Sequence, residues 1–296
     1  MVPLMPIRGS DDVEMPAAGE RAHRLRVCLT FDLDAVSLWT ATFRSTSPSD
    51  LSRGEFGPAV AVPRILELLA SRGLSATFFV PAITARQFSA TIREIAAAGH
   101  EVAAHGDLHE RVVKLTRVEE LDVQRRSVET LSAIVGREPR GYRAPGWEIS
   151  PHTIEILEEL GFRYDSSQMG TDYRPYRARR GDRIDDADWS AGVESNVWEI
   201  PVSWELDDFP PFFIRPPAFL PARSIREVEE MWREEFDYAH AHAAGGVFTL
   251  TMHPQIIGRG PRLQMLERLV RYMSEHDKVD FATVADVADA LDVSAG

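Results

Sequence analysis

The stretch Leu25-Arg-Val-Cys-Leu-Thr-Phe-Asp-Leu-Asp34 predicts a buried strand that ends in two acidic residues. Asp32 and Asp34 are separated by one leucine, so in an extended chain both carboxylates point to the same side. Like charges at this range raise the pKa of one carboxyl unless a cation or an arginine neutralises them. We therefore expect a functional site where this strand leaves its sheet.

Apolar strands and amphipathic helices alternate along the rest of the chain in units of roughly 25–40 residues, which predicts an α/β fold with a parallel sheet, open or closed into a barrel. Two stretches, 168–191 and 205–222, break this rhythm, and we expect them to be lids, binding walls or oligomer contacts. The predicted strands are 27–31, 75–80, 100–104, 198–203, 247–252 and a short one near Phe281; the predicted helices are 60–72, 84–98, 116–136, 150–161, 224–243, 260–276 and a last one from Val284.

The bulk composition favours an acidic, soluble enzyme. The chain has 296 residues with 33 Lys and Arg against 46 Asp and Glu, a formal net charge of −13, which argues against nucleic acid or anionic membrane as a partner. Residues 1–23 carry several acids and no apolar core, so we expect a flexible tail, no secretory signal and a cytoplasmic address, with one domain over 24–296. Cys28, the only cysteine, is expected to be buried and inert.

Three residues are candidate metal ligands. His105 and His109 stand four apart after a predicted strand, and we expect both rings on one side of a helical turn. With Asp34 they give one carboxylate and two imidazoles, and three protein ligands with an open position are typical of catalytic zinc-like sites. Histidine spacing alone is weak evidence; the acids and His253 at other strand ends strengthen it.

Two further residues are candidates for proton transfer. Asp32 would be the general base that accepts a proton from water, although a strand-end acid can also be a helix or turn cap. His253 ends the run Val247-Phe-Thr-Leu-Thr-Met252 and would be the general acid that protonates a leaving nitrogen. Taken alone, a histidine in this place can also be a hydrogen-bonded core residue.

The segment Gly141-Tyr-Arg-Ala-Pro-Gly-Trp147 carries a third cluster. Arg143 could hold Asp32 ionised, and Trp147 could form a wall of the pocket or merely cover the core. Asp165 follows a short predicted strand and could orient Arg143 or His253.

These motifs resemble those of the polysaccharide deacetylase family, the NodB-like or chitooligosaccharide deacetylases, from Leu25 to about Ala290. The resemblance implies a distorted (β/α) barrel with Asp32 as base, Asp34 as metal ligand, His105-Gly-Asp-Leu-His109 as the histidine motif and Leu250-Thr-Met-His253 as the last motif. It also implies one divalent ion, usually zinc and sometimes cobalt or nickel.

The chain departs from the usual family pattern in two places. The common Asp-Asp-Gly is here Asp32-Leu-Asp34, and the aromatic residue expected after Pro145 is displaced by Gly146, whose N–H we expect to stabilise an oxyanion. The segments 32–39, 165–169 and 204–211 are similar to an intracellular subgroup of peptidoglycan-deacetylase-like, allantoinase-like and cyclic-imide-hydrolase-like proteins. Members of that subgroup are oligomers, often tetramers, so the resemblance implies a homo-oligomer.

Three functions stay open at this point. The first is a metal-dependent hydrolase of non-peptide carbon–nitrogen bonds that deacetylates an N-acetylated sugar or cleaves a small amide. The second is a hydrolase that opens a cyclic imide or an allantoin-like ureide, which the bulky aromatics favour. The third is a non-catalytic, glycan-binding barrel. The residues expected to contact substrate are Trp39, Gly146, Trp147, Met169, Tyr173 and Trp204.

Overall fold

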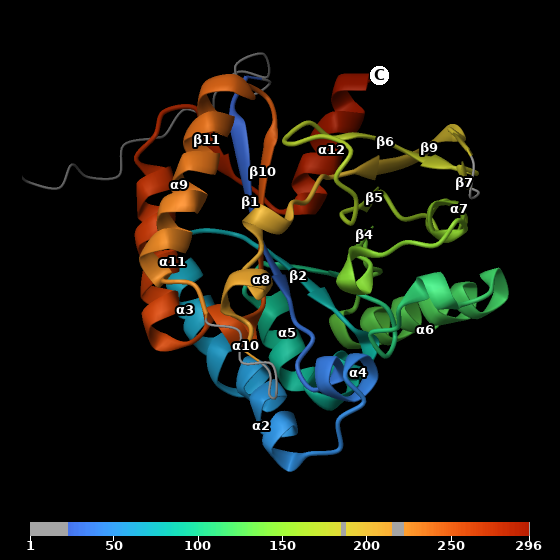
Figure 1. The fold of residues 1–296 in the computed structure, drawn as a ribbon, viewed down its shortest axis with the longest axis horizontal. Coiled ribbons are helices and arrows are strands. Elements are labelled where there is room, and N and C mark those ends of the chain that lie inside the picture. The colour runs from blue at the N-terminus through green and yellow to red at the C-terminus, as the bar shows by residue number, and fades with distance from the viewer. Residues whose placement is uncertain (1–22, 185–187, 215–221, 296) are drawn as a thin grey trace, which may run out of the picture.

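A curled, mostly parallel sheet forms the centre of the computed structural model, which describes residues 23–184, 188–214 and 222–295 (Figure 1). The strands are β1 (Leu25–Asp32), β2 (Thr77–Val80), β3 (Glu101–Ala104), β4 (Gly141–Tyr142), β5 (Tyr164–Asp165), β6 (Tyr176–Arg180), β7 (Arg183–Ile184), β8 (Trp189–Ser190), β9 (Val193–Glu199), β10 (Val247–Met252) and β11 (Val279–Phe281).

Helices surround this sheet. They are α2 (Pro48–Phe56), α3 (Val62–Ser71), α4 (Ala82–Gln87), α5 (Ser89–Ala97), α6 (Arg117–Val135), α7 (Thr153–Glu159), α8 (Phe209–Phe212), α9 (Ile225–His242), α10 (Pro254–Ile257), α11 (Gly260–Ser274) and α12 (Val284–Ala295). Single turns occur at η1 (Leu38–Thr42), η2 (Gly57–Ala61), η3 (Val112–Lys114), η4 (Pro145–Trp147) and η5 (Trp204–Leu206).

The strand order β10-β1-β2-β3-β4-β5-β9-β6 gives the predicted distorted (β/α) barrel. Each neighbouring pair from β10 to β9 is parallel, and only β6 runs antiparallel to its neighbour. The barrel is open between β10 and the β9–β6 end, where the segment after β5 lies along β10: the amide of Val247 donates to the Tyr173 carbonyl at 2.7 Å. The carboxyl ends of the parallel strands therefore meet at one rim, where sites are built in such folds.

The strands are apolar because both of their faces are covered. Every residue of β10 is buried, and its register with β1 places Leu29 beside Leu250 and Phe31 beside Met252. The helices add their apolar faces, for example Ile65 and Leu69 of α3, to the same core. Parallel strands buried on both sides read as continuous apolar runs, which is why this part of the fold was predictable. Cys28 is buried and free, as predicted.

Helix α6 is another feature that the sequence predicted. Thr116 accepts from the amide of Glu119, whose carboxylate accepts from the amide of Thr116 in return, a capping box. The helix ends at Gly136, whose φ of 81° suits glycine.

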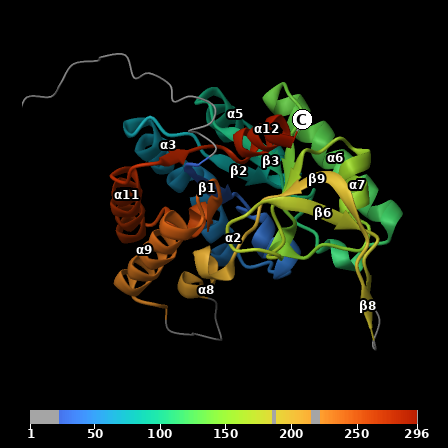
Figure 2. The same cartoon turned by 90° about the horizontal axis from the view of Figure 1, so that it is seen from above.

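Several predicted boundaries were wrong. The helix expected over 84–98 is divided at Phe88 into α4 and α5, because Phe88 leaves the helical conformation. The strand expected over 198–203 ends at Glu199 as β9. The stretch 168–191 is not only loop: it contributes β6, β7 and β8, and Figure 2 shows β7 and β8 projecting from the body. Antiparallel pairing outside the apolar core needs little hydrophobic patterning, so these strands carry no periodic signal in the sequence.

Two expectations concern the chain as a whole. The predicted tail, 1–23, lies outside the described residues except for its last position. Among the helices of the described residues, none combines the length and apolarity needed to cross a membrane.

Candidate metal centre and catalytic site

Asp34, His105 and His109 converge at the rim of the barrel, with Asp34 following β1 and the histidines following β3. The Oδ1 atom of Asp34 lies 3.4 Å from Nε2 of His105 and 3.4 Å from Nε2 of His109. Two ligands bonded at 2.0–2.1 Å to one tetrahedral ion lie roughly 3.3 Å apart. The Asp34 oxygen therefore lies at a zinc-like spacing from each imidazole nitrogen, and the three ligand atoms all lie within 4.8 Å of one another.

The imidazole orientations suit metal binding. His105 Nδ1 lies 2.7 Å from the Arg143 carbonyl oxygen, which can only accept, so this nitrogen carries the proton and Nε2 offers its lone pair. His109 Nδ1 lies 2.8 Å from the hydroxyl of Thr42. A contact at Nδ1 thus orients each ring so that its Nε2 faces Asp34. Hydrogen bonds to the nitrogen that does not bind the metal orient metal-ligating histidines in the same way.

The expectation of a helical turn between the two histidines was wrong. Residues 105–109 form a loop, and His109 has a φ of 68°, an uncommon value for a residue other than glycine. The two rings still lie 5.1 Å apart between centroids, because the loop curls where the helix would have turned. Residues with such uncommon backbone angles are found more often at functional sites than elsewhere.

The Asp34 carboxylate is held ionised although it is buried. Burial alone would raise the pKa of Asp34, but His109, His105 and His253 lower it well below its ordinary value when these imidazoles are protonated. With the imidazoles neutral, a bound cation would have the same effect. Its Oδ1 atom has no hydrogen-bond donor among the described residues, and only 1% of Asp34 is exposed. A buried carboxylate oxygen without a donor, facing two imidazole lone pairs, is what a bound cation would satisfy.

Arg143 contacts Asp32, the pairing that the sequence indicated. Its Nη1 donates to Asp32 Oδ1 at 2.7 Å and to the Thr30 hydroxyl at 2.9 Å. Its other nitrogens donate to the carbonyl oxygen and hydroxyl of Ser166, and the guanidinium lies over Phe79 at 4.1 Å. Because the Arg143 side chain is completely buried, these contacts fix the position of the Asp32 carboxylate.

His253 lies next to Asp34 and contacts two acids that were not predicted as site residues. Its Nδ1 is 2.8 Å from Asp208 Oδ1 and 3.5 Å from Asp207 Oδ1, while Nε2 is 3.8 Å from Asp34 Oδ2. Burial alone would lower the pKa of His253, but Asp207 and Asp208 raise it well above its ordinary value. Burial in turn raises the pKa of Asp207 to about 7. His253, Asp207 and Asp208 therefore form a buried group that can bind and release a proton next to the candidate metal ligands.

Sequence reasoning missed the role of Asp207 and Asp208, although the segment 204–211 was noted as a family signal. They follow η5, and Asp207 forms an isolated bridge with Thr251 at the end of β10. The Asp208 amide also donates to the Thr251 carbonyl at 3.2 Å. The only sequence signal was a pair of acids before an aromatic-proline run, which does not reveal its neighbour in space.

Asp165 does not take the place expected for it. Its Oδ1 accepts from the Ser167 hydroxyl at 2.6 Å, and no hydrogen bond or ion pair joins it to Arg143 or His253, so it orients neither of them directly. Glu199 is its partner in the pairing of β5 with β9. Burial raises the pKa of Asp165 to about 6 and that of Glu199 well above its ordinary value. Ser167 in turn accepts from the Ala144 amide at 2.8 Å, which ties the pair to the Arg143 segment.

Gly146 lies in η4 with a φ of 66°, and a Cβ there would meet no atom within 4 Å. Pro145 packs against the histidine loop: a Cβ on Gly106 would approach its Cγ to 3.5 Å. The segment that carries the predicted oxyanion amide is therefore in contact with the segment that carries the metal ligands.

The predicted substrate-contacting aromatics do not form one wall. Trp147 and Trp204 pair at 4.2 Å between ring centroids. Trp39 is buried and packs against Phe213 at 5.8 Å in a different place.

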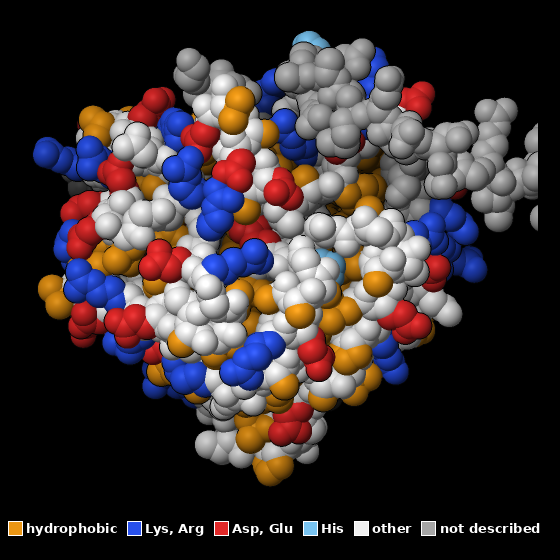
Figure 3. Space-filling model, turned by 180° about the vertical axis from the view of Figure 1, so that it is seen from behind, with side chains coloured by type: hydrophobic (Ala, Val, Ile, Leu, Met, Phe, Trp, Pro, Cys, Tyr) orange, Lys and Arg blue, Asp and Glu red, His pale blue; other side chains and the backbone are white. Residues whose placement is uncertain are grey.

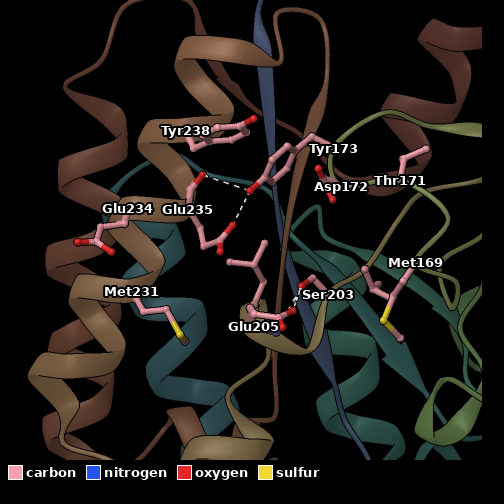
Figure 4. Close-up of a pocket in the computed structure, with 12 residues that line it drawn as sticks. Met169, Thr171, Asp172, Tyr173, Ser203, Glu205, Met231, Glu234, Glu235 and Tyr238 are labelled. Carbon is pink, nitrogen blue, oxygen red and sulfur yellow. Dashed lines mark hydrogen bonds between the residues drawn. The ribbon is translucent and has the colours of Figure 1, made fainter.

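Met169 and Tyr173 line a third place, a cavity of about 640 Å³ at the seam of the barrel (Figure 4). The Tyr173 hydroxyl there donates to Glu235 of α9, and the other acids on its wall are Asp172, Glu205 and Glu234. Among the described residues that line it, none belongs to the metal ligands.

Comparison with known proteins now identifies the family. A family model for polysaccharide deacetylases matches residues 55–164. The peptidoglycan deacetylase of Helicobacter pylori is 36% identical over 282 residues, which cover 90% of this chain and 96% of the relative. The chain belongs to the polysaccharide deacetylase family. It is accordingly a hydrolase of carbon–nitrogen bonds other than peptide bonds, as the motifs predicted.

Other relatives of this deacetylase agree. The peptidoglycan deacetylase-like protein FGM2 of Gibberella zeae is 29% identical, covering 91% of this chain and 87% of the relative. A solved structure from Mycobacterium smegmatis, assigned to the polysaccharide deacetylases, is 32% identical with a TM-score of 0.83 and covers 99% of this chain and 96% of its own. PuuE allantoinase shares the fold, with a TM-score of 0.74 at 20% identity over 97% of this chain and 99% of its own. The predicted family and barrel are confirmed.

Proposed function

We propose that this deacetylase removes the acetyl group from N-acetylated sugars of a polysaccharide, with peptidoglycan as the first candidate. The observation that carries the proposal is the set of groups brought together at one rim: Asp32 paired with Arg143, Asp34 at 3.4 Å from both His105 and His109, and His253 paired with Asp208 and 3.8 Å from Asp34. The names of the relatives in Helicobacter pylori and Gibberella zeae supply the substrate class.

Asp34, His105 and His109 would hold the metal ion, and we propose zinc, with cobalt or nickel as alternatives. When bound, the ion supplies a Lewis acid that polarises the amide carbonyl and lowers the pKa of water. One carboxylate and two imidazoles leave an open position, the donor set of a catalytic rather than a structural site.

The protein groups then divide the proton transfers between them. Asp32 accepts a proton from the attacking water, and its hydrogen bond from Arg143 holds the carboxylate in position. The Gly146 amide stabilises the negative charge that develops on the carbonyl oxygen. His253 donates a proton from Nε2 to the leaving nitrogen, since Asp208 occupies its Nδ1 and keeps the ring charged.

The test is turnover of N-acetylglucosamine oligomers by protein that has been chelated and reloaded with zinc. We expect chelation to abolish acetate release and zinc to restore it. Full activity in a preparation that elemental analysis shows to be metal-free would contradict the metal assignment.

A second candidate is the opening of a cyclic imide or ureide. The burial of the reactive groups favours it: Asp32 is 2% exposed and His253 is 8% exposed, which suits a small ligand better than a polymer. Succinimide and allantoin assayed beside the sugar oligomers separate the two. Turnover of the acetylated sugars alone would exclude this candidate.

The third reading, a non-catalytic glycan-binding barrel, makes a different prediction. If it were right, Asp32→Asn would leave unchanged any turnover seen with the wild type. The complete set of base, metal ligands and acid supports catalysis instead.

We also propose a cytoplasmic homo-oligomer, for instance a tetramer, that binds neither nucleic acid nor membrane. Supporting this, the face in Figure 3 mixes acidic and basic side chains instead of presenting a basic field, and the net charge is −13. Light scattering of the purified protein, retention on a polyanion column and cell fractionation test the three parts.

A further inference from the structure

A second cavity, of about 340 Å³, lies beside the metal centre and has a basic wall. It is enclosed by η1, α2, α8, α10 and the start of α11; α2, α8 and α10 lie near one another in Figure 1. Its lining includes Arg53, Arg259, Arg262, Gln255, Trp39 and Phe213, and no Asp or Glu among the described residues. In a chain of net charge −13, this concentration of arginines without acids is unusual.

The arginines of this basic cavity are held mainly by aromatic rings. Arg259 lies over Phe56 at 3.6 Å, and Arg262 lies over Phe212 at 4.8 Å. Arg262 also donates one hydrogen bond to the Ile256 carbonyl at 3.2 Å. No carboxylate of the described residues lies within ion-pair distance of either guanidinium, so most of their donors remain available.

The positive charges in the cavity oppose one another. Burial lowers the pKa of Arg259, and Arg53 and Arg64 lower it further. Burial and Arg259 also lower the pKa of Arg262, which Asp208 partly offsets. An anion in the cavity would relieve this repulsion.

Gln255 gives an independent indication of a ligand. It is only 7% exposed, yet among the described residues neither its amide oxygen nor its amide nitrogen has a hydrogen-bond partner. Buried side-chain amides are nearly always paired, because an unpaired one costs free energy. Since Gln255 lines the cavity, a ligand there can supply the missing partner.

We propose that the basic cavity binds the oxyanion, carboxylate or phosphate, of a small organic ligand. Arg259 and Arg262 hold the oxyanion, Gln255 donates its amide N–H, and the Trp39 and Phe213 rings contact the apolar remainder. The guanidinium group of arginine matches the geometry of planar oxyanions. An aromatic lining favours the binding of an organic anion over that of a hydrated inorganic ion. The cavity flanks the reaction centre: α10 follows His253 directly, and η1 begins four residues after Asp34.

The test is calorimetric titration of the zinc-loaded protein with benzoate and with inorganic phosphate. We expect saturable binding of one anion per chain, benzoate more tightly than phosphate. The double variant R259Q/R262Q should bind at least about tenfold more weakly, because hydrogen bonds to charged groups are lost. Q255M, which keeps the length but removes the amide, should bind several-fold more weakly.

The matched control is R72Q/R93Q, which removes two exposed arginines away from the cavity and leaves the same net charge as R259Q/R262Q. Melting temperatures without anion show that the variants fold. Equal binding by wild type, R259Q/R262Q and the control would overturn the proposal, because the anion would then be on the metal or elsewhere. Absence of saturable binding to wild type would overturn it as well.

A kinetic arm distinguishes the two sources of such an anion. If benzoate raises KM of wild type for an active substrate and does not do so for R259Q/R262Q, the cavity receives an acidic group of the substrate. If benzoate alters kcat alone, it receives a free effector. The titration needs no turnover, so its failure is separate from a failure of the proposed deacetylation.

Discussion

Two clusters of histidine and carboxylate lie side by side in this molecule and behave in opposite ways. In the first, two imidazoles surround the single carboxylate of Asp34, whose pKa is held well below its ordinary value. In the second, Asp207 and Asp208 surround the single imidazole of His253, whose pKa is held well above its ordinary value. The ratio of imidazoles to carboxylates thus decides which group is stabilised in its charged form. In the first cluster it is the Asp34 carboxylate, which suits a candidate cation site, and in the second it is the His253 imidazolium, which suits a proton donor.

The largest expected effect comes from Asp34→Asn. The amide cannot supply the negative charge that balances a divalent ion, so the metal content of the purified protein should fall to near zero. Activity should fall by more than about 10³-fold, because the Lewis acid is lost. Elemental analysis and acetate release measure the two effects. Retention of a full equivalent of zinc would show that the first cluster does not depend on its carboxylate.

Asp208→Asn tests the second cluster. It keeps the size of the side chain but removes the charge that raises the pKa of His253, so turnover should fall by about 10²-fold with zinc still bound. Since a raised pKa keeps His253 protonated to higher pH, the alkaline limb of the kcat profile should move to lower pH by about one unit or more. An unchanged alkaline limb would mean that His253 is not the acid.

Asp207→Asn sharpens the same comparison with a smaller change. Asp207 lies farther from His253 than Asp208 does, at 3.5 Å against 2.8 Å, and an amide oxygen can still accept from the Phe209 amide. We expect a loss of only about threefold in kcat. A loss as large as that of Asp208→Asn would make the two acids equal partners.

The smallest effect on activity is expected for Asp165→Asn. The amide can donate to Glu199 and still accept from Ser167, so it imitates the protonated carboxyl, and turnover should stay within about twofold. A large loss of turnover with normal stability would restore Asp165 to the catalytic set.

Stability should reveal what Asp165 does. Its folded pKa, about 6, lies above the ordinary 3.8, so the native protein holds the extra proton and its stability falls as pH rises from about 4 through 6. Asp165→Asn removes this dependence, worth about 1.4 kcal/mol per pH unit for each extra proton held. Urea unfolding of wild type and variant between pH 4 and 7 measures the difference in slope.

The chain alone determined the barrel, the convergence of the candidate metal ligands and the Asp32–Arg143 pairing. Continuous apolar runs such as Val247–Met252 are local signals of buried parallel strands, and such strands bring their carboxyl ends to one rim. Asp34, His105 and His109 could therefore be placed together although they are far apart in sequence.

Only the tertiary structure decided the partners of His253, the contacts of Asp165 and the gathering of arginines beside α10. Asp208 meets His253 through one isolated bridge at Thr251, and Asp165 meets Glu199 through strand pairing across the barrel. Contacts between such distant residues produce no periodic pattern of apolar residues in the sequence. The protonation of a buried carboxyl depends on which charges surround it in space, and not on its neighbours along the chain.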